Sequence, residues 1–191
     1  MRIYRLFLLF PLLLMVGCNN PFRPPLRDNS NHAILNRSPE EVLQNLERAY
    51  KEKNINIFKS LLHPDFRFEL LSSEVNQIGV DIDGDGFKDS WWGYDQEIEF
   101  TSNMFYYGSS DGLYPVADMI DLRLQIPPQA NWQTDPEVGH ENWIIIPCSF
   151  DLILSYNSMN TSYVANGVAR FYLRKDDGRW SIAIWRDESF L

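Results

Sequence analysis

An acidic loop carries the clearest chemical pattern in this sequence, Asp81-Ile82-Asp83-Gly84-Asp85-Gly86-Phe87-Lys88-Asp89. Carboxylates occupy its first, third, fifth and ninth positions, and the glycine at the sixth allows a sharp turn that brings oxygen ligands together. Ca²⁺ is a hard cation that binds several such oxygens. The pattern therefore predicts a structural calcium site, in which Asp81, Asp83, Asp85 and Asp89 offer side-chain oxygens and Phe87 offers its backbone carbonyl.

The loop resembles those of EF-hands and dockerins, with one departure at its twelfth position. This position is Trp92, where an EF-hand places a bidentate Glu. Either Asp95 or Glu97 takes over that role, or the site binds weakly, with a dissociation constant of roughly 10⁻⁴–10⁻³ M. The alternative is a solvated Asp-Gly turn between two short strands. Carboxylates at this density repel one another, which favours a bound cation.

A second set of polar residues lies on predicted strands. Residues two apart along a strand share a face, so Asp121 and Arg123 lie together, as do Arg170 and Tyr172. These four residues are candidates for pocket groups. The alternative is that they line the solvent face of an antiparallel sheet.

The chain has two cysteines, Cys18 and Cys148. The apolar run around Cys148, from Trp143 to Phe150, predicts a buried and chemically inert thiol. A catalytic thiolate would need a histidine in reach, and none of the three histidines forms a recognisable Cys/His pattern.

Cys18 ends a segment that is typical of a targeting signal. Arg2 and Arg5 precede an apolar run, 6–16, that is too short to span a bilayer as a helix. Gly17 stands directly before Cys18, and this ending resembles the signal of a bacterial lipoprotein. The alternative is an ordinary secretory signal with an unrelated cysteine.

The lipoprotein resemblance implies that residues 1–18 are a signal peptide and that Cys18 is acylated, for example with palmitate. The lipid would anchor the protein to a membrane of the bacterial cell envelope, with the domain in the periplasm or at the cell surface. Asn19 stands where an Asp would favour the inner membrane, so the resemblance implies the outer membrane.

Composition limits the partners. The formal net charge of −9 argues against a nucleic-acid backbone or an anionic membrane surface as the main partner. The length of 191 residues suits one domain with appendages. Residues 19–37 contain Pro21, Pro24 and Pro25 and predict a flexible linker before that domain.

The domain, 38–191, is predicted to begin with helices. Ser38 can cap a helix whose first position suits Pro39, and a second short helix begins near Asn54. A strand follows over 66–70, and Asp95 can cap a third helix. The acidic loop, about 81–92, is an insertion between that strand and the third helix.

The second half of the domain predicts long strands. They cover Val116 to Ile126, Asn142 to Tyr156, Ser162 to Lys175 and Arg179 to Asp187. Asp176-Asp177-Gly178 supplies a hairpin turn between the last two strands. Helices followed by a long antiparallel sheet indicate an α+β fold.

The final strand contains two tryptophans, Trp180 and Trp185, an odd number of positions apart. Strict alternation places them on opposite faces of the sheet. We expect Trp180 on the core side, with Trp180→Ala costing about 3–5 kcal/mol of stability.

The order of these elements resembles the nuclear transport factor 2-like superfamily, which includes ketosteroid isomerase and the SnoaL-type cyclases. The segments that carry the resemblance are Leu62-His63-Pro64-Asp65-Phe66, Gly167-Val168-Ala169-Arg170-Phe171-Tyr172-Leu173 and Gly178-Arg179-Trp180. The resemblance covers about 38–191. It implies a cone-shaped, cystatin-like fold, in which a curved antiparallel sheet wraps the N-terminal helices and leaves a pocket at its wide end.

This superfamily contains isomerases, dehydratases, cyclases and pure binding domains, so the fold does not give the function. No pair of residues here matches a catalytic dyad of the family at its position. The leading hypothesis is a non-enzymatic domain that binds a small ligand or a protein partner. The alternative is an isomerase or dehydratase that uses Asp and Tyr groups of the pocket.

Overall fold

The computed structural model describes residues 35–109, 112 and 115–189. The predicted signal peptide, its Cys18 and nearly all of the predicted linker lie outside the described residues. Within these described ranges, no helix combines the length and the apolar character that crossing a membrane requires.

Two helices open the domain, and local caps fix both starts. Helix α1, Pro39–Lys51, follows Ser38, whose hydroxyl accepts a 3.1 Å hydrogen bond from the Glu41 backbone N–H. Helix α2, Ile55–Leu61, follows Asn54, whose side-chain oxygen accepts from the backbone N–H groups of the next turn. Both predicted helix starts are confirmed.

Seven strands of the described residues form one sheet, in the order β2-β1-β7-β6-β5-β3, with β4 paired to β5. The pairing of β1 with β7 is parallel and all other pairs are antiparallel. The strands are β1 Leu62–Glu69, β2 Trp91–Gly93, β3 Met119–Gln125, β4 Gln133–Thr134, β5 Ile144–Tyr156, β6 Thr161–Asp176 and β7 Arg179–Asp187.

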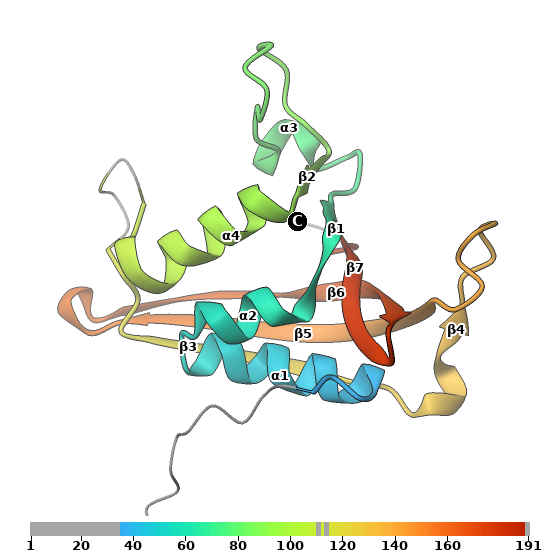
Figure 1. The fold of residues 1–191 in the computed structure, drawn as a ribbon. Helices are drawn as coiled ribbons and strands as arrows, with labels where there is room; N and C mark the ends of the chain where they lie inside the picture. The colour runs from blue at the N-terminus through green and yellow to red at the C-terminus, as the bar shows by residue number, and fades with distance from the viewer. Residues whose placement is uncertain (1–34, 110–111, 113–114, 190–191) are drawn as a thin grey trace, which may run out of the picture. The chain divides into compact units, whose positions relative to one another are not determined.

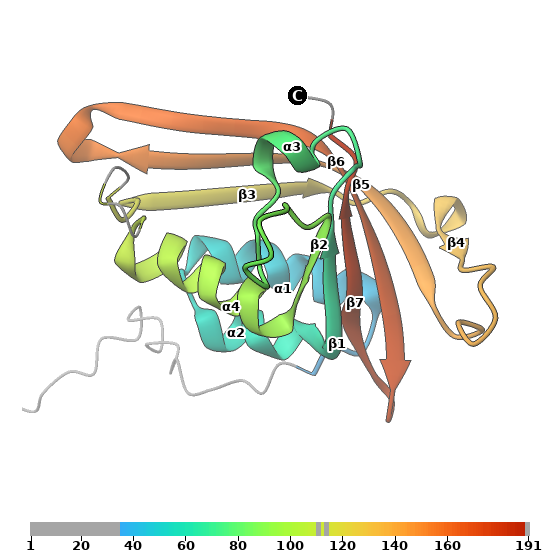
Figure 2. The same ribbon diagram turned by 90° about the horizontal axis from the view of Figure 1, so that it is seen from above.

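The sheet bends around the helices, which cover one of its faces (Figures 1 and 2). Helix α1 packs against β3 and β7, and helix α4, Tyr94–Ser102, packs against β1. The core between the layers contains Phe58 of α2, Phe66 of β1 and Phe171 of β6, each at most 2% exposed. The predicted α+β fold, with a curved sheet around N-terminal helices, is confirmed.

The turn between β6 and β7 has the predicted position. Asp177 (φ 49°) and Gly178 (φ 79°) both adopt positive φ, as a two-residue turn of this kind requires. The predicted hairpin is therefore confirmed.

The predicted opposite faces of Trp180 and Trp185 are wrong. The β6–β7 register shifts between Tyr172 and Leu173, so that Ala183 has no partner on β6. Such a bulge inverts the alternation beyond it. Trp185 is therefore buried in the core, and Trp180, which is only partly buried, packs against the same core.

Helix α4 begins close to the predicted position but without the predicted cap. Its N-cap is Gly93, which offers no side-chain hydrogen bond, and Asp95 lies exposed in the first turn. Beyond Ser102 the chain continues as a π-helical turn, Asn103–Tyr107. The short helix α3, Val75–Ile78, precedes the acidic loop, which projects away from the sheet (Figure 1).

Candidate functional site

A pocket of about 320 Å³ lies between the helices and the concave face of the sheet. This volume is at the lower end of the range of small-molecule sites. Its polar lining residues are Tyr50, Glu97, Thr101 and Asp187. The remainder of the lining is apolar or aromatic: Phe68, Trp92, Phe100, Met104, Leu122, Phe150, Leu152, Ala165 and Trp185.

Helix α4 supplies the acid of this pocket. Glu97 and Thr101 are four residues apart and therefore share one face of the helix, where they are 6% and 2% exposed. The Glu97 carboxylate accepts hydrogen bonds from Trp92 Nε1 (2.7 Å) and from Thr101 Oγ1 (3.2 Å). The Trp92 ring in turn stacks on Phe68 of β1, with centroids 4.4 Å apart.

The environment of the pocket favours the neutral forms of Glu97 and Tyr50. Burial raises the pKa of Glu97, and the hydrogen bonds from Trp92 and Thr101 oppose this rise. Burial, and next the nearby Glu97 carboxylate, also raise the pKa of Tyr50, so that its hydroxyl keeps its proton. The pocket can therefore surround an apolar or aromatic molecule and offer it hydrogen bonds along one edge.

Sequence reasoning did not identify Glu97 as a pocket residue. The loop spacing made Glu97 a substitute calcium ligand, but its side chain is buried in the concave pocket and hydrogen-bonded to Trp92 and Thr101. The only local signal is an acid and a threonine four residues apart on a helix. This spacing indicates a pocket only when the tertiary structure brings β1 and β2 beside the helix.

The four polar residues predicted on strands lie in two separate groups. On β3, Arg123 Nη2 and Asp121 Oδ2 form an ion pair of 2.7 Å. The neighbouring Ile120 and Leu122 are buried, so the ion pair lies on the opposite face of the strand. Arg170 and Tyr172 of β6 line a different hollow. The four side chains do not converge in one closed cavity.

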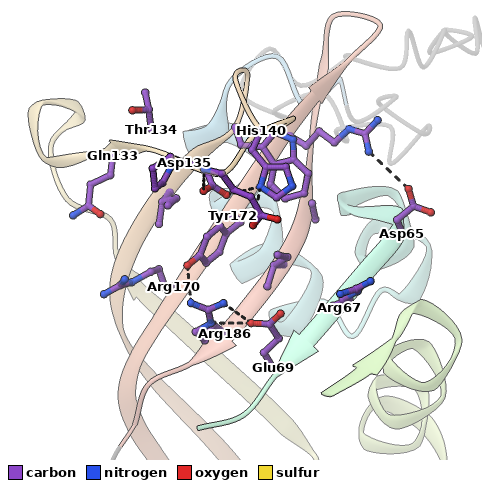
Figure 3. A pocket seen from close by; sticks show the side chains of 17 residues that line it. Asp65, Arg67, Glu69, Gln133, Thr134, Asp135, His140, Arg170, Tyr172 and Arg186 are labelled. Carbon is purple, nitrogen blue, oxygen red and sulfur yellow. Dashed lines mark hydrogen bonds and ion pairs between the residues drawn. The ribbon is translucent and has the colours of Figure 1, made fainter. Parts of the chain in front are cut away.

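This second hollow, of about 1040 Å³, lies on the outer face of the sheet (Figure 3). Strands β1, β5, β6 and β7 and the segment 133–143 line it. Arg186 donates hydrogen bonds to Glu69 Oε2 (2.6 and 2.8 Å) and to Tyr172 Oη (2.8 Å). Arg170 pairs with Glu188 at 3.1 Å. The hollow is thus a polar surface of paired charges.

The acidic loop folds around its own carboxylates. Asp81 accepts hydrogen bonds from the backbone N–H groups of Gly84 (2.7 Å) and Gly86 (3.0 Å), and Asp89 accepts one from Ile82 (3.0 Å). Further such bonds join Asp83 to the Asp85 N–H and Asp85 to the Phe87 N–H. Carboxylate oxygens of Asp81, Asp83 and Asp89 lie within 4.8 Å of one another. Calcium binding by this loop stays a prediction.

Calcium at millimolar concentration is expected to raise the melting temperature of the protein. A ligand that binds only the folded state stabilises that state by mass action. The Asp83→Ala, Asp85→Ala double variant should keep the fold and lose this rise. Calorimetry that shows no shift in the wild type, or an equal shift in the variant, leaves only a polar turn.

Cys148 is fully buried on β5, opposite Ala169 of β6. Burial, and next the Glu47 carboxylate, raise the pKa of its thiol to about 12. We expect this thiol to react with an aromatic disulfide reagent only as fast as the domain unfolds. A Cys18→Ser variant leaves Cys148 as the only thiol of the chain. Rapid modification of this variant in native buffer contradicts the prediction.

No protein-family model and no curated protein sequence matches this chain. Solved structures do match. A putative aromatic ring hydroxylase from Novosphingobium aromaticivorans is 13% identical with a TM-score of 0.55, and the match covers 82% of this chain and 90% of that one.

A putative scytalone dehydratase from the same organism is 12% identical with a TM-score of 0.54, over 81% of this chain and 83% of that one. A nuclear transport factor 2-like superfamily protein from Salmonella enterica is 13% identical with a TM-score of 0.50, over 79% of this chain and 87% of that one. Together with the curved sheet and its helical cover, these matches show that the domain has the nuclear transport factor 2-like fold.

Proposed function

We propose that this domain is a non-enzymatic binding module, which takes a small, largely apolar or aromatic molecule into the concave pocket. The observation that carries the proposal is the lining of that pocket, where ten of the thirteen described residues are apolar or aromatic, Tyr50 among them. Burying an apolar surface against such walls is favourable, at about 25 cal/mol per Å². The few polar groups would orient the ligand.

The arrangement of the acid supports binding over catalysis. Both oxygens of Glu97 already accept hydrogen bonds from protein groups, which gives the carboxyl a structural role. Among the described residues that line this pocket there is no histidine, lysine or arginine. The second candidate is an isomerase or dehydratase that uses Glu97 as a proton donor, and the raised pKa of this acid favours it.

Adjacent residues of β6 allow a matched test of the pocket. Ala165 lines the concave pocket, whereas the next side chain, Val164, is 61% exposed and lies on the other face. We expect the neutral fluorophore N-phenylnaphthylamine to bind the wild type and the Val164→Trp variant alike. The Ala165→Trp variant should bind it at least tenfold more weakly, because the indole fills the pocket.

Equal binding by all three proteins would refute the site. Native mass spectrometry of protein purified from cells then separates the two functions. A bound molecule that is recovered unchanged after incubation supports a binding module, whereas its conversion to another compound supports the enzyme.

We further propose that Cys18 carries a lipid and holds the domain to the bacterial cell envelope, at the outer membrane. The Gly17-Cys18 ending after a short apolar run supports this proposal. The Cys18→Ser variant is expected to lose membrane association and the label from a fatty acid fed to cells. A variant that still sediments with membranes and carries the label contradicts lipidation at this cysteine.

A further inference from the structure

A cluster of three metal-binding side chains lies at the rim of the outer hollow, away from the concave pocket. It consists of Asp135, Glu137 and His140, in the segment between β4 and β5. We infer that these residues form a site for a divalent transition metal of the zinc class. Figure 3 shows Asp135 and His140 side by side above Tyr172.

The donor atoms are spaced for one cation. His140 Nδ1 lies 2.7 Å from Asp135 Oδ2 and 3.6 Å from Glu137 Oε2. One donor atom from each of the three residues lies within 4.8 Å of the other two. Zinc bonds of about 2.0–2.2 Å place tetrahedral ligand atoms roughly 3.4 Å apart, so small side-chain movements complete the coordination.

Protein contacts hold the side chains of Asp135 and His140 in place before any metal binds. The Asp135 side chain is 6% exposed, and its Oδ1 accepts a 3.1 Å hydrogen bond from the Glu137 backbone N–H. This leaves Oδ2 directed at the imidazole. The His140 ring stacks on Trp143, with centroids 3.7 Å apart and planes 9° apart.

Backbone hydrogen bonds close the segment that carries these ligands. The His140 N–H donates to Glu137 O (3.0 Å), the Trp143 N–H to His140 O (2.9 Å) and the Asp135 N–H to Trp143 O (3.4 Å). A closed segment in which two of the three ligand side chains are already held loses little conformational freedom on binding a metal.

The kind of donor selects the kind of metal. An imidazole nitrogen with two carboxylates suits Zn²⁺, whereas Ca²⁺ and Mg²⁺ prefer oxygen ligands alone. The acidic loop offers only oxygens, so the chain would separate two metals by ligand chemistry. Positions not filled by protein face the hollow and would hold water.

Zinc binding to the full chain tests the site. Calorimetric titration with ZnCl₂ alone should show one strong site and a higher melting temperature, and Co²⁺ should produce visible absorption bands of a nitrogen–oxygen site. The His140→Gln variant should bind zinc at least tenfold more weakly and lose the bands, because even an outer-sphere partner of a metal ligand is worth 10–100-fold in affinity.

Two controls make the result specific. His63→Gln removes the other histidine of the described residues that lies near carboxylates. His63 Nε2 is 3.4 Å from Asp176 Oδ2, and His63 Nδ1 is 3.7 Å from Asp65 Oδ2. This variant and the Asp83→Ala, Asp85→Ala variant should both bind zinc as the wild type does. The site is overturned if His140→Gln binds zinc unchanged, if either control loses binding equally, or if Co²⁺ gives no bands with the folded wild type.

Discussion

Replacing Trp185 with alanine is expected to lower the free energy of unfolding by about 3–5 kcal/mol. The indole is 8% exposed and lies 4.9 Å from the ring of Phe171 and 5.6 Å from that of Phe68, measured between centroids. Its removal leaves a cavity where the core meets the concave pocket, and the surrounding strands cannot close over it. Denaturant unfolding followed by circular dichroism measures the loss.

The matched control is Trp180→Ala, on the same strand. Trp180 packs against the core but is only partly buried, and the Lys175 ammonium lies 5.7 Å from its ring centroid. Less apolar surface leaves water when this ring folds into place, so its truncation should cost clearly less than that of Trp185. If Trp180→Ala lowered the free energy of unfolding more than Trp185→Ala, Trp180 and not Trp185 would be the main core residue, contrary to a bulge at Ala183.

Glu97 should make the protein less stable as the pH rises. Burial raises the pKa of Glu97 in the folded state above its ordinary value of 4.5. Above that ordinary value the unfolded chain releases the proton while the folded domain still holds it, so stability falls until the pH passes the folded-state pKa. Below the ordinary value of 4.5, Glu97 is protonated in both the folded and the unfolded state, so it does not change the stability with pH.

The Glu97→Gln variant should remove this pH dependence and be more stable than the wild type at neutral pH. The amide oxygen still accepts from Trp92 Nε1, and no charge has to be buried. Glu97→Leu, in contrast, leaves the indole N–H without an acceptor, which costs about 1–3 kcal/mol.

The free energy of unfolding, measured against pH for the wild type, Glu97→Gln and Glu99→Gln, tests this expectation. Glu99 lies exposed on the same helix, so Glu99→Gln is the matched control and should follow the wild-type curve. A Glu97→Gln curve that keeps the wild-type slope would show that another group causes the pH dependence.

The sequence by itself determined the features that depend on neighbours along the chain. The caps of α1 and α2, the positive-φ turn at 177–178 and the self-bonded acidic loop all form from residues a few positions apart. Segments rich in β-branched and aromatic residues also predicted the long strands, and the apolar run 143–150 predicted the buried Cys148. These features follow from local sterics and hydrogen bonding, which a short segment already contains.

Only the tertiary structure decided where the functional groups meet. The parallel pairing of β1 with β7 joins residues more than a hundred positions apart and brings Phe68 and Trp185 together in one wall. The same packing takes Glu97 out of water and gives it Trp92 as a partner. The bulge at Ala183 moved Trp185 into the core. Burial and long-range pairing decide these outcomes, because a side chain's partners across a sheet are not encoded in its own segment.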